Sequence, residues 1–234
     1  MSALANEEVG KYLNQHFVSS FQKVATFRIV GGAKQGGNVA TYFCAPDGRV
    51  LHIVAGPVNA ATMLNESKWV VETARRAIAE AKGDGARFKA IMRTAHAQKL
   101  KAETGLVVEP TTFDAPETDP SSALTYSDPT GRPLAPKLPP PPIDGPDVTL
   151  KAEALDALRA GAAKAPGARR LEDRKGRPWV VGNQARVDQL LAGYSMAKIE
   201  NLYGTVFENI LGEKISTKPV EMVTPFPWLK RKGD

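Results

Sequence analysis

The chain has 234 residues, a net charge of +6 and a hydrophobic content of 42%. This length suggests one or two domains of roughly 150 residues each. No apolar run reaches the ~18 residues needed to cross a bilayer, and the start MSALANEEVG lacks the basic and apolar regions of a signal peptide. We therefore expect a cytoplasmic protein without a membrane span, unless the sequence is part of a longer chain.

Charge and proline content divide the chain into three segments. Residues 1–108 carry 14 Lys/Arg and 8 Asp/Glu, residues 109–147 carry 2 and 7, and residues 148–234 carry 15 and 10. The middle segment also holds 11 of the 18 prolines and few aliphatic side chains, so it buries too little apolar surface to form a core. We predict an α/β domain over 1–108, an acidic Pro-rich linker over 109–147, and a basic, mostly helical module over 148–234. Two alternatives for the middle segment are ordered coil lying on a flanking unit and a Pro-rich ligand for an aromatic groove.

The first unit begins with a short helix, because Val9, Tyr12 and Leu13 share one side of the stretch from 7 to 14. The residues from 16 to 24 are β-like, and residues 26–30 are expected either to extend that strand or to form a second one.

A β-hairpin follows, in which the strands VATYFCA and RVLHIVAG are joined by Pro46-Asp47-Gly48. Proline and glycine at these positions are typical of a type I turn. Asn59 then predicts the N-cap of a helix that ends at the glycines of 83–85, and another helix is expected over 86–103.

The last unit is expected to hold helices over 150–163, 184–192 and 195–211, with a basic loop over 165–177. Ser195 is a candidate N-cap, and Gly212 a candidate terminator, of the last helix. With about 87 residues and few strands, this unit is marginal as an independent domain and is expected to dock on the first.

The sequence offers few candidates for catalysis. The glycine-rich stretch GGAKQGG, residues 31–37, lacks the pattern of a phosphate loop and leads into a strand instead of a helix. Cys44 is the only cysteine, and its place in an apolar strand favours a packing thiol. A reactive thiolate would need a nearby cation, for which His52 across the hairpin is the one candidate.

A metal or cofactor is not predicted. A single cysteine excludes a thiolate zinc site and an internal disulfide, and His16, His52 and His96 stand on three different elements without ligand spacing. We expect each of these histidines to be a hydrogen-bonded core residue or an exposed one.

Local basic clusters occur at 169–170, 174–177 and 230–232, near Trp179 and Trp228. Such clusters can bind nucleic-acid backbones, but no helix-turn-helix, zinc-finger or RNA-binding signature accompanies them. A solvated basic surface is therefore the simpler interpretation, and nucleic acid stays a possible but unsupported partner.

One stretch carries a family resemblance. The order of strand, Pro-Asp-Gly turn, strand and helix in GNVATYFCAPDGRVLHIVAGPVNAATMLNESKWVVETA resembles the second half of a thioredoxin-like domain, and EEVGKYLNQHFV is similar to the helix end and strand that precede it. AHAQKLKAE, GNQARVDQLLA and YGTVFENILGEKIS further resemble uncharacterised thioredoxin-like proteins of planctomycete-type bacteria. The resemblance implies a thioredoxin-like unit, possibly without its first strand.

The chain departs from the redox chemistry of that family. Thioredoxin-like oxidoreductases use a CxxC at a helix N-terminus and a cis-proline beside the hairpin. This sequence has no CxxC, and Val39 stands where the proline is expected. Either the fold has lost redox function, or a CxxC lies upstream of Met1 in a longer form.

We therefore expect a non-catalytic, thioredoxin-like binding or scaffold protein with a protein partner. The alternatives are a thiol-disulfide oxidoreductase, with Cys44 as the candidate reactive thiol, and a binder of nucleic acid or another anionic surface. The candidate interaction surface comprises Gly36, Gly37, Asn38, Trp69 and Trp179.

Overall fold

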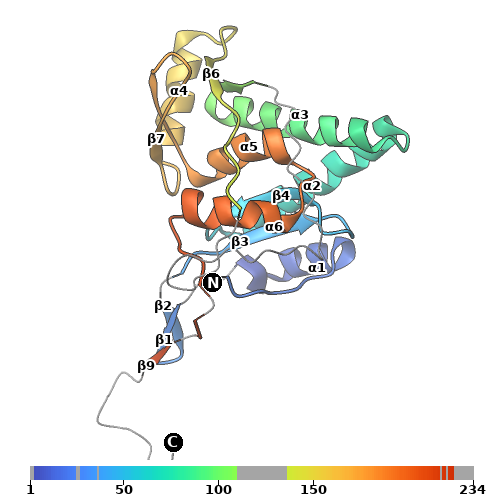
Figure 1. Ribbon diagram of the computed structural model, residues 1–234, viewed down its shortest axis with the longest axis vertical. Helices are drawn as coiled ribbons and strands as arrows, with labels where there is room; N and C mark the ends of the chain where they lie inside the picture. The colour runs from blue at the N-terminus through green and yellow to red at the C-terminus, as the bar shows by residue number, and fades with distance from the viewer. Residues whose placement is uncertain are drawn as a thin grey trace, which may run out of the picture.

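The computed structural model describes residues 3–24, 27–35, 37–109, 136–216, 218–219 and 221–223 of a mixed α/β protein (Figure 1). Its elements in chain order are η1 (Ala3–Ala5), α1 (Glu7–His16), β1 (Arg28–Val30), β2 (Ala33–Gln35), β3 (Ala40–Cys44), β4 (Val50–Ala55), α2 (Ala60–Ala81), α3 (Gly85–Thr104), β5 (Leu106–Val108), β6 (Ile143–Pro146), α4 (Ala152–Ala163), β7 (Arg169–Glu172), β8 (Pro178–Val181), α5 (Asn183–Tyr194), α6 (Ile199–Gly204), the π-helical turn η3 (Thr205–Ile210) and β9 (Glu221–Val223). None of the described helices is long and apolar enough to cross a membrane.

The antiparallel hairpin β3–β4 forms the middle layer of the main body (Figure 1). Gly48 adopts a φ of +81° in its turn, and the Asp47 carboxylate accepts a hydrogen bond of 3.1 Å from the backbone N–H of Arg49, so the predicted turn is confirmed. Every residue of β4 is buried. One face, including Phe43 and Val54, packs with α1 and α2, and the other, including Ile53, packs with α5, α6 and η3.

Helices α2 and α3 form a long antiparallel pair whose connecting turn projects from the body (Figure 1). The Asn59 side chain caps α2, as predicted, by accepting from the N–H of Thr62 at 2.8 Å. Asp84 caps α3 in the same way, because its carboxylate satisfies free N–H groups of the first turn. Lys82 and Gly83, which end α2, both adopt positive φ.

Residues from the two predicted units lie in one apolar cluster. Val50 and Ile53 of the hairpin pack with Val187 and Leu191 of α5, and all four side chains are at most 1% exposed. Helix α5 also packs closely along α3. Helices α5 and α6 and the η3 turn therefore pack on the hairpin, and α5 also packs on α3.

The end of the proline-rich segment is ordered against this body. The N–H of Leu138 donates to the Thr205 hydroxyl at 2.7 Å, and the Gln189 amide donates to the carbonyl of Pro141 at 2.8 Å. Strand β6 then pairs with β5 in antiparallel register. Residues 136–147 thus follow the ordered-coil alternative, whereas 110–135 lie outside the described residues.

Three expected elements differ in the structure. The β-like residues 17–24 form no strand, and Phe21 is 85% exposed, so their apolar side chains do not pack as a strand face. The expected loop over 165–177 contains β7, which pairs with β8.

The expected helix over 195–211 begins only at Ile199, because the backbone of 196–198 pairs with β4 instead. The N–H of Met196 donates to the carbonyl of Val50 at 2.8 Å, and the N–H of Val50 donates to the carbonyl of Ala197 at 2.9 Å. Ser195 is accordingly the C-cap of α5 and not an N-cap.

Candidate functional site

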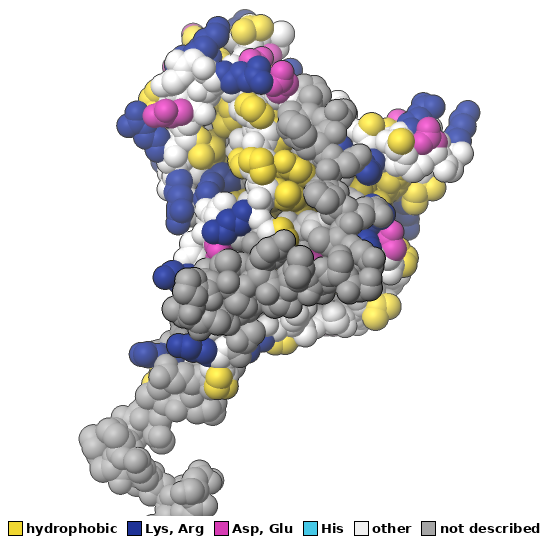
Figure 2. Space-filling view, in the orientation of Figure 1, with side chains coloured by type: hydrophobic (Ala, Val, Ile, Leu, Met, Phe, Trp, Pro, Cys, Tyr) yellow, Lys and Arg dark blue, Asp and Glu magenta, His cyan; other side chains and the backbone are white. Residues whose placement is uncertain are grey.

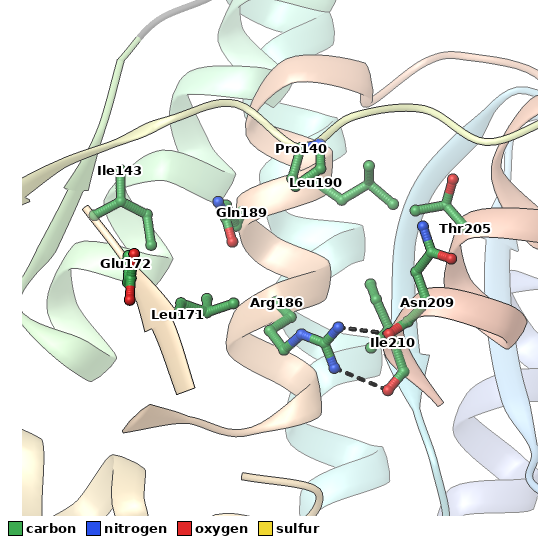
Figure 3. A pocket seen from close by; sticks show the side chains of 10 residues that line it. All are labelled: Pro140, Ile143, Leu171, Glu172, Arg186, Gln189, Leu190, Thr205, Asn209 and Ile210. Atoms are coloured by element: carbon green, nitrogen blue, oxygen red, sulfur yellow. Dashed lines mark hydrogen bonds between the residues drawn. The ribbon is translucent and has the colours of Figure 1, made fainter. Parts of the chain in front are cut away.

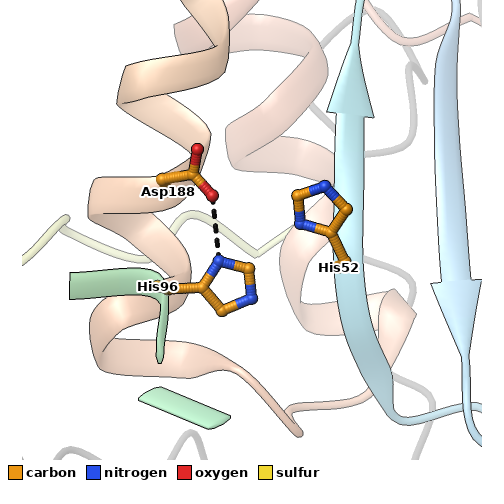
Figure 4. Close-up of side chains that lie close together, drawn as sticks. All are labelled: His52, His96 and Asp188. Carbon is orange, nitrogen blue, oxygen red and sulfur yellow. Dashed lines mark hydrogen bonds and ion pairs between the residues drawn. The ribbon is translucent and has the colours of Figure 1, made fainter. Parts of the chain in front are cut away.

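A cluster of buried titratable side chains lies between the hairpin and two helices (Figure 4). His52 comes from β4, His96 from α3 and Asp188 from α5, and all three residues are 0% exposed. One ligand atom from each side chain lies within 4.8 Å of those of the other two. No other such group of His, Cys, Asp and Glu occurs among the residues that the structure describes.

Local structure explains how these side chains meet. Met92, His96 and Leu100 are one helical turn apart and form the buried side of α3. His52 stands opposite Phe43 in the hairpin register, with their rings stacked at 6.1 Å. Because α5 packs against both β4 and α3, it brings Asp188 to the same place.

His96 bonds through both ring nitrogens. Its Nε2 lies 2.9 Å from the carbonyl oxygen of Leu51, and its Nδ1 lies 2.9 Å from Oδ1 of Asp188. A carbonyl oxygen only accepts, so Nε2 carries a proton and donates it. The contact between Nδ1 and the carboxyl group then needs one further proton, carried by either partner.

His52 bonds through one ring nitrogen only. Its Nε2 lies 2.9 Å from Oε2 of Glu66. Burial lowers the pKa of His52 more than the neighbouring carboxylates raise it, so the ring is neutral at pH 7. Burial alone would raise the pKa of Glu66, but the bond from His52 and the charge of Lys99 hold it below its ordinary value. The ionised carboxylate only accepts, so the single proton of His52 is on Nε2, and Nδ1 has a free lone pair.

Two acceptor atoms of the cluster have no hydrogen-bond partner in the described part of the chain. They are Nδ1 of His52 and Oδ2 of Asp188. An unsatisfied buried polar group costs about 1–3 kcal/mol, and natural structures contain few of them. Both atoms belong to side chains of one cluster, so the two unsatisfied hydrogen-bond acceptors lie in the same part of the core.

An ionic shell surrounds the cluster on its α2 side. Lys99 lies 3.1 Å from Glu66 and also pairs with Glu103. Burial lowers the pKa of Lys99, but the charges of Asp188, Glu103 and Glu66 outweigh it and raise the pKa above its ordinary value. The Lys99 ammonium lies 5.6 Å from the Trp69 ring centroid, and that ring in turn lies 4.9 Å from the ring of His52.

The cluster is sealed from solvent, and this limits its chemistry. At 0% exposure the three side chains offer no face to a substrate, so the arrangement can hold a proton or a small cation but not an organic ligand. The hollow of about 230 Å³ in Figure 3 lies elsewhere, between residues 140–143, β7, α5 and the α6–η3 segment. Its only cationic side chain, Arg186, already donates to the carbonyls of Ile210 and Asn209.

The structure separates Cys44 from His52. The register pairs Phe43 with His52 and Cys44 with Val50. Cys44 is partly buried against the apolar side chains that the hairpin shares with α5, α6 and η3. Burial, together with the negative charges of Glu200 and Asp47, raises the pKa of the thiol to about 11. Because Cys44 follows Phe43 in β3, its side chain lies on the opposite face of the hairpin from His52, and the two residues are not brought together.

The described residues of the predicted interaction surface come from three places in the chain, since Gly37 and Asn38 precede β3, Trp69 belongs to α2 and Trp179 belongs to β8. Trp179 is 4% exposed, donates to the Asp173 carboxylate at 3.2 Å and lies beneath Arg159. Trp69 is partly buried beside the histidines. Asn38 donates its side-chain N–H to the carbonyl of Leu211 at 3.1 Å. Gly37 has a φ of +72° before β3, and Gly36 lies outside the described residues.

The sequence interpretation missed the grouping of His52, His96 and Asp188. A polar residue inside an apolar run, as in VLHIVA, was the available signal, since a buried histidine needs partners. Nothing in the spacing of positions 52, 96 and 188 points to a common site.

Comparisons with protein-family models, with curated proteins and with solved structures find no match for this chain.

Proposed function

We propose that this protein is a non-catalytic binding or scaffold protein whose first part descends from a thioredoxin-like unit. The layered arrangement of β3–β4, with α1 and α2 on one face and α5 and α6 on the other, supports this relationship. The state of Cys44 is the observation that carries the non-catalytic part. A thiol with a pKa near 11 is scarcely ionised at pH 7, and thiolate is the nucleophile in thiol chemistry.

The surface best suited to a partner is the outer end of the α2–α3 pair. Residues 75–93 hold six Lys/Arg and two Asp/Glu. A shallow groove of about 370 Å³ lies there, lined by two cationic side chains, one acidic side chain and neutral ones: Arg76, Arg87, Glu80, Ala90, Ile91, Thr94, Ala95 and Gln98. Ile78 on the same helix as Arg76 is 64% exposed. Figure 2 shows Lys and Arg side chains at this projecting end with hydrophobic side chains beside them.

An excess of positive charge beside an exposed apolar side chain fits an acidic protein segment with interspersed apolar residues. Opposite charge steers the association of the two chains and fixes the alignment of the partner on this surface. The contact with Ile78 adds binding free energy that does not depend on charge. Nucleic acid would use the charge but not Ile78. The proposed partner is therefore an acidic polypeptide.

The binding test uses the full chain and a labelled Glu/Leu peptide, with duplex DNA of equal charge as the competing probe. The double variant Arg76→Glu/Arg87→Glu is compared with Arg170→Glu, whose side chain is exposed on β7. We expect wild type and Arg170→Glu to bind the peptide equally and the double variant to lose binding. Preference for DNA, or equal binding by the double variant, would refute this assignment of the surface.

The enzymatic alternative is tested separately by incubating the protein with a disulfide-bonded peptide and a reductant. We expect no acceleration of disulfide exchange by wild type relative to Cys44→Ser. A Cys44-dependent acceleration would overturn the non-catalytic assignment while leaving the peptide-binding result unaffected.

A further inference from the structure

The His52–His96–Asp188 cluster contains the donor set of a metal site. Nδ1 of His96 points at the Asp188 carboxylate, and the His52 ring lies 5.3 Å from the His96 ring (Figure 4). Each ring has its Nε2 occupied by an outer partner. Metal-bound histidines in proteins almost always donate their second ring N–H to a carboxylate or a backbone carbonyl. Glu66 provides the carboxylate for His52, and Leu51 provides the carbonyl for His96.

The unsatisfied atoms belong to the same donor set. Nδ1 of His52 has no hydrogen-bond partner in the described part of the chain, and neither does Oδ2 of Asp188. Nδ1 of His96 faces the carboxylate at 2.9 Å, where a proton must lie. A cation at this point satisfies all three atoms and replaces that proton.

Charge and geometry narrow the kind of ion. The carboxylates of Asp188, Glu66 and Glu103 are opposed by one cationic side chain, Lys99, and this excess of negative charge favours a divalent cation. Zinc bonds to nitrogen and oxygen at about 2.0–2.2 Å, which places tetrahedral ligands about 3.4 Å apart. The ligand atoms of the three residues lie within 4.8 Å of one another, so the side chains would have to draw closer around an ion. The two nitrogens and both oxygens of Asp188 together offer four donor atoms, in a distorted tetrahedral arrangement because the two oxygens of one carboxylate lie closer together than separate ligands do.

We infer that His52, His96 and Asp188 form a closed, structural binding site for one divalent transition-metal ion of the zinc class. Iron oxygenases also use two histidines and one carboxylate, but they keep open positions for substrate, and this site is 0% exposed. The ion would link β4, α3 and α5, and so would fasten the C-terminal segment to the hairpin. The site is separate from the outer end of α2 and α3, so the metal-binding inference does not depend on the proposed binding function.

The first test measures metal on the tag-free full chain. Purified protein is analysed by mass spectrometry of its metals, stripped with a chelator, and titrated with Co²⁺ as a spectroscopic probe. We expect one zinc per chain before stripping, and one Co²⁺ per chain afterwards with the intense visible bands of tetrahedral coordination. Substoichiometric uptake of both ions by folded wild-type protein overturns the inference.

The second test uses matched variants. Asp188→Asn and His96→Asn are expected to abolish stoichiometric binding, whereas His16→Asn, at the third and partly exposed histidine, is expected to leave it unchanged. Loss of binding in His16→Asn, or tetrahedral Co²⁺ bands that persist in Asp188→Asn, contradicts the site.

A third variant guards against unfolding of the first two. Glu66→Gln removes the outer carboxylate from His52 without touching a ligand, and it should weaken binding by about 10–100-fold. Circular dichroism of each variant identifies those that fold. An unchanged affinity in folded Glu66→Gln contradicts the role assigned to Glu66 and, with it, the proposed coordination of His52.

Discussion

Replacing Leu191 with alanine tests whether the segments before and after the proline-rich region share one core. Leu191 is 0% exposed and packs with Val50 and Ile53 of the hairpin. The change removes about three methylene-sized groups at ~0.8 kcal/mol each and leaves a cavity, which together predict a loss of roughly 3–4 kcal/mol. With a urea m-value of about 2–3 kcal/mol/M, the unfolding midpoint should fall by roughly 1–2 M.

Two tryptophans let each segment report separately. Trp69 belongs to α2, before the proline-rich region, and Trp179 belongs to β8, after it. Urea unfolding is followed by fluorescence in one background that keeps only Trp69 and another that keeps only Trp179, each with and without Leu191→Ala. We expect both reporters to shift by the same amount, because the buried cluster couples the two segments.

The result that would refute this reasoning is a shift confined to Trp179. That outcome would mean that 1–108 and 148–234 unfold as independent domains. Leu4→Ala is the matched control, since Leu4 is 56% exposed and its truncation should change stability by no more than about 0.5 kcal/mol.

Three further predictions follow from single sites. Because the pKa of Cys44 is about 11, its labelling rate with a thiol reagent should rise about tenfold per pH unit from 7 to 10, and a plateau below pH 9 would contradict this. Burial alone would raise the pKa of Asp173, but hydrogen bonds from Arg177, Trp179 and Lys175 lower it to about 2. The ionised Asp173 therefore stabilises the fold above pH 3.8, and this stabilisation is lost as the pH falls toward 2. Asp173→Asn should accordingly reduce the dependence of the melting temperature on pH in this range. Gly105→Ala should cost at least about 1–2 kcal/mol, since Gly105 has a φ of +72° and an added Cβ would lie 2.7 Å from Leu155. Gly161→Ala, in the last turn of α4 where an added Cβ would meet no atom within 4 Å, should be neutral or stabilising.

The elements that the sequence predicted well are those with local causes. The turn at Pro46-Asp47-Gly48, the cap at Asn59 and the break at 83–85 each depend on a few adjacent residues, and the structure confirms all three. Propensity and capping act over one turn of chain, so they can be evaluated without tertiary structure.

The elements that were missed depend on distant partners. Residues 196–198 are not helical because their backbone forms hydrogen bonds with Val50 at the start of β4. Strand β7 forms because β8 pairs with it. Conversely, the β-like residues 17–24 find no partner strand, and Phe21 stays exposed. Strand formation requires a second strand, which a local pattern cannot supply.

The candidate site falls between these two cases. In β4 every residue is buried, and in α3 His96 shares the buried side with Met92 and Leu100. The apolar pattern alone therefore places His52 and His96 in the core, and the desolvation of their ring nitrogens then requires hydrogen-bond partners there. What the pattern could not indicate is that both rings reach the same point, since this depends on the packing of α3 and α5 against the hairpin. The partner Asp188 was hidden for the same reason: α5 is buried on almost every side, so its apolar periodicity does not distinguish a core-facing carboxylate from a solvated one.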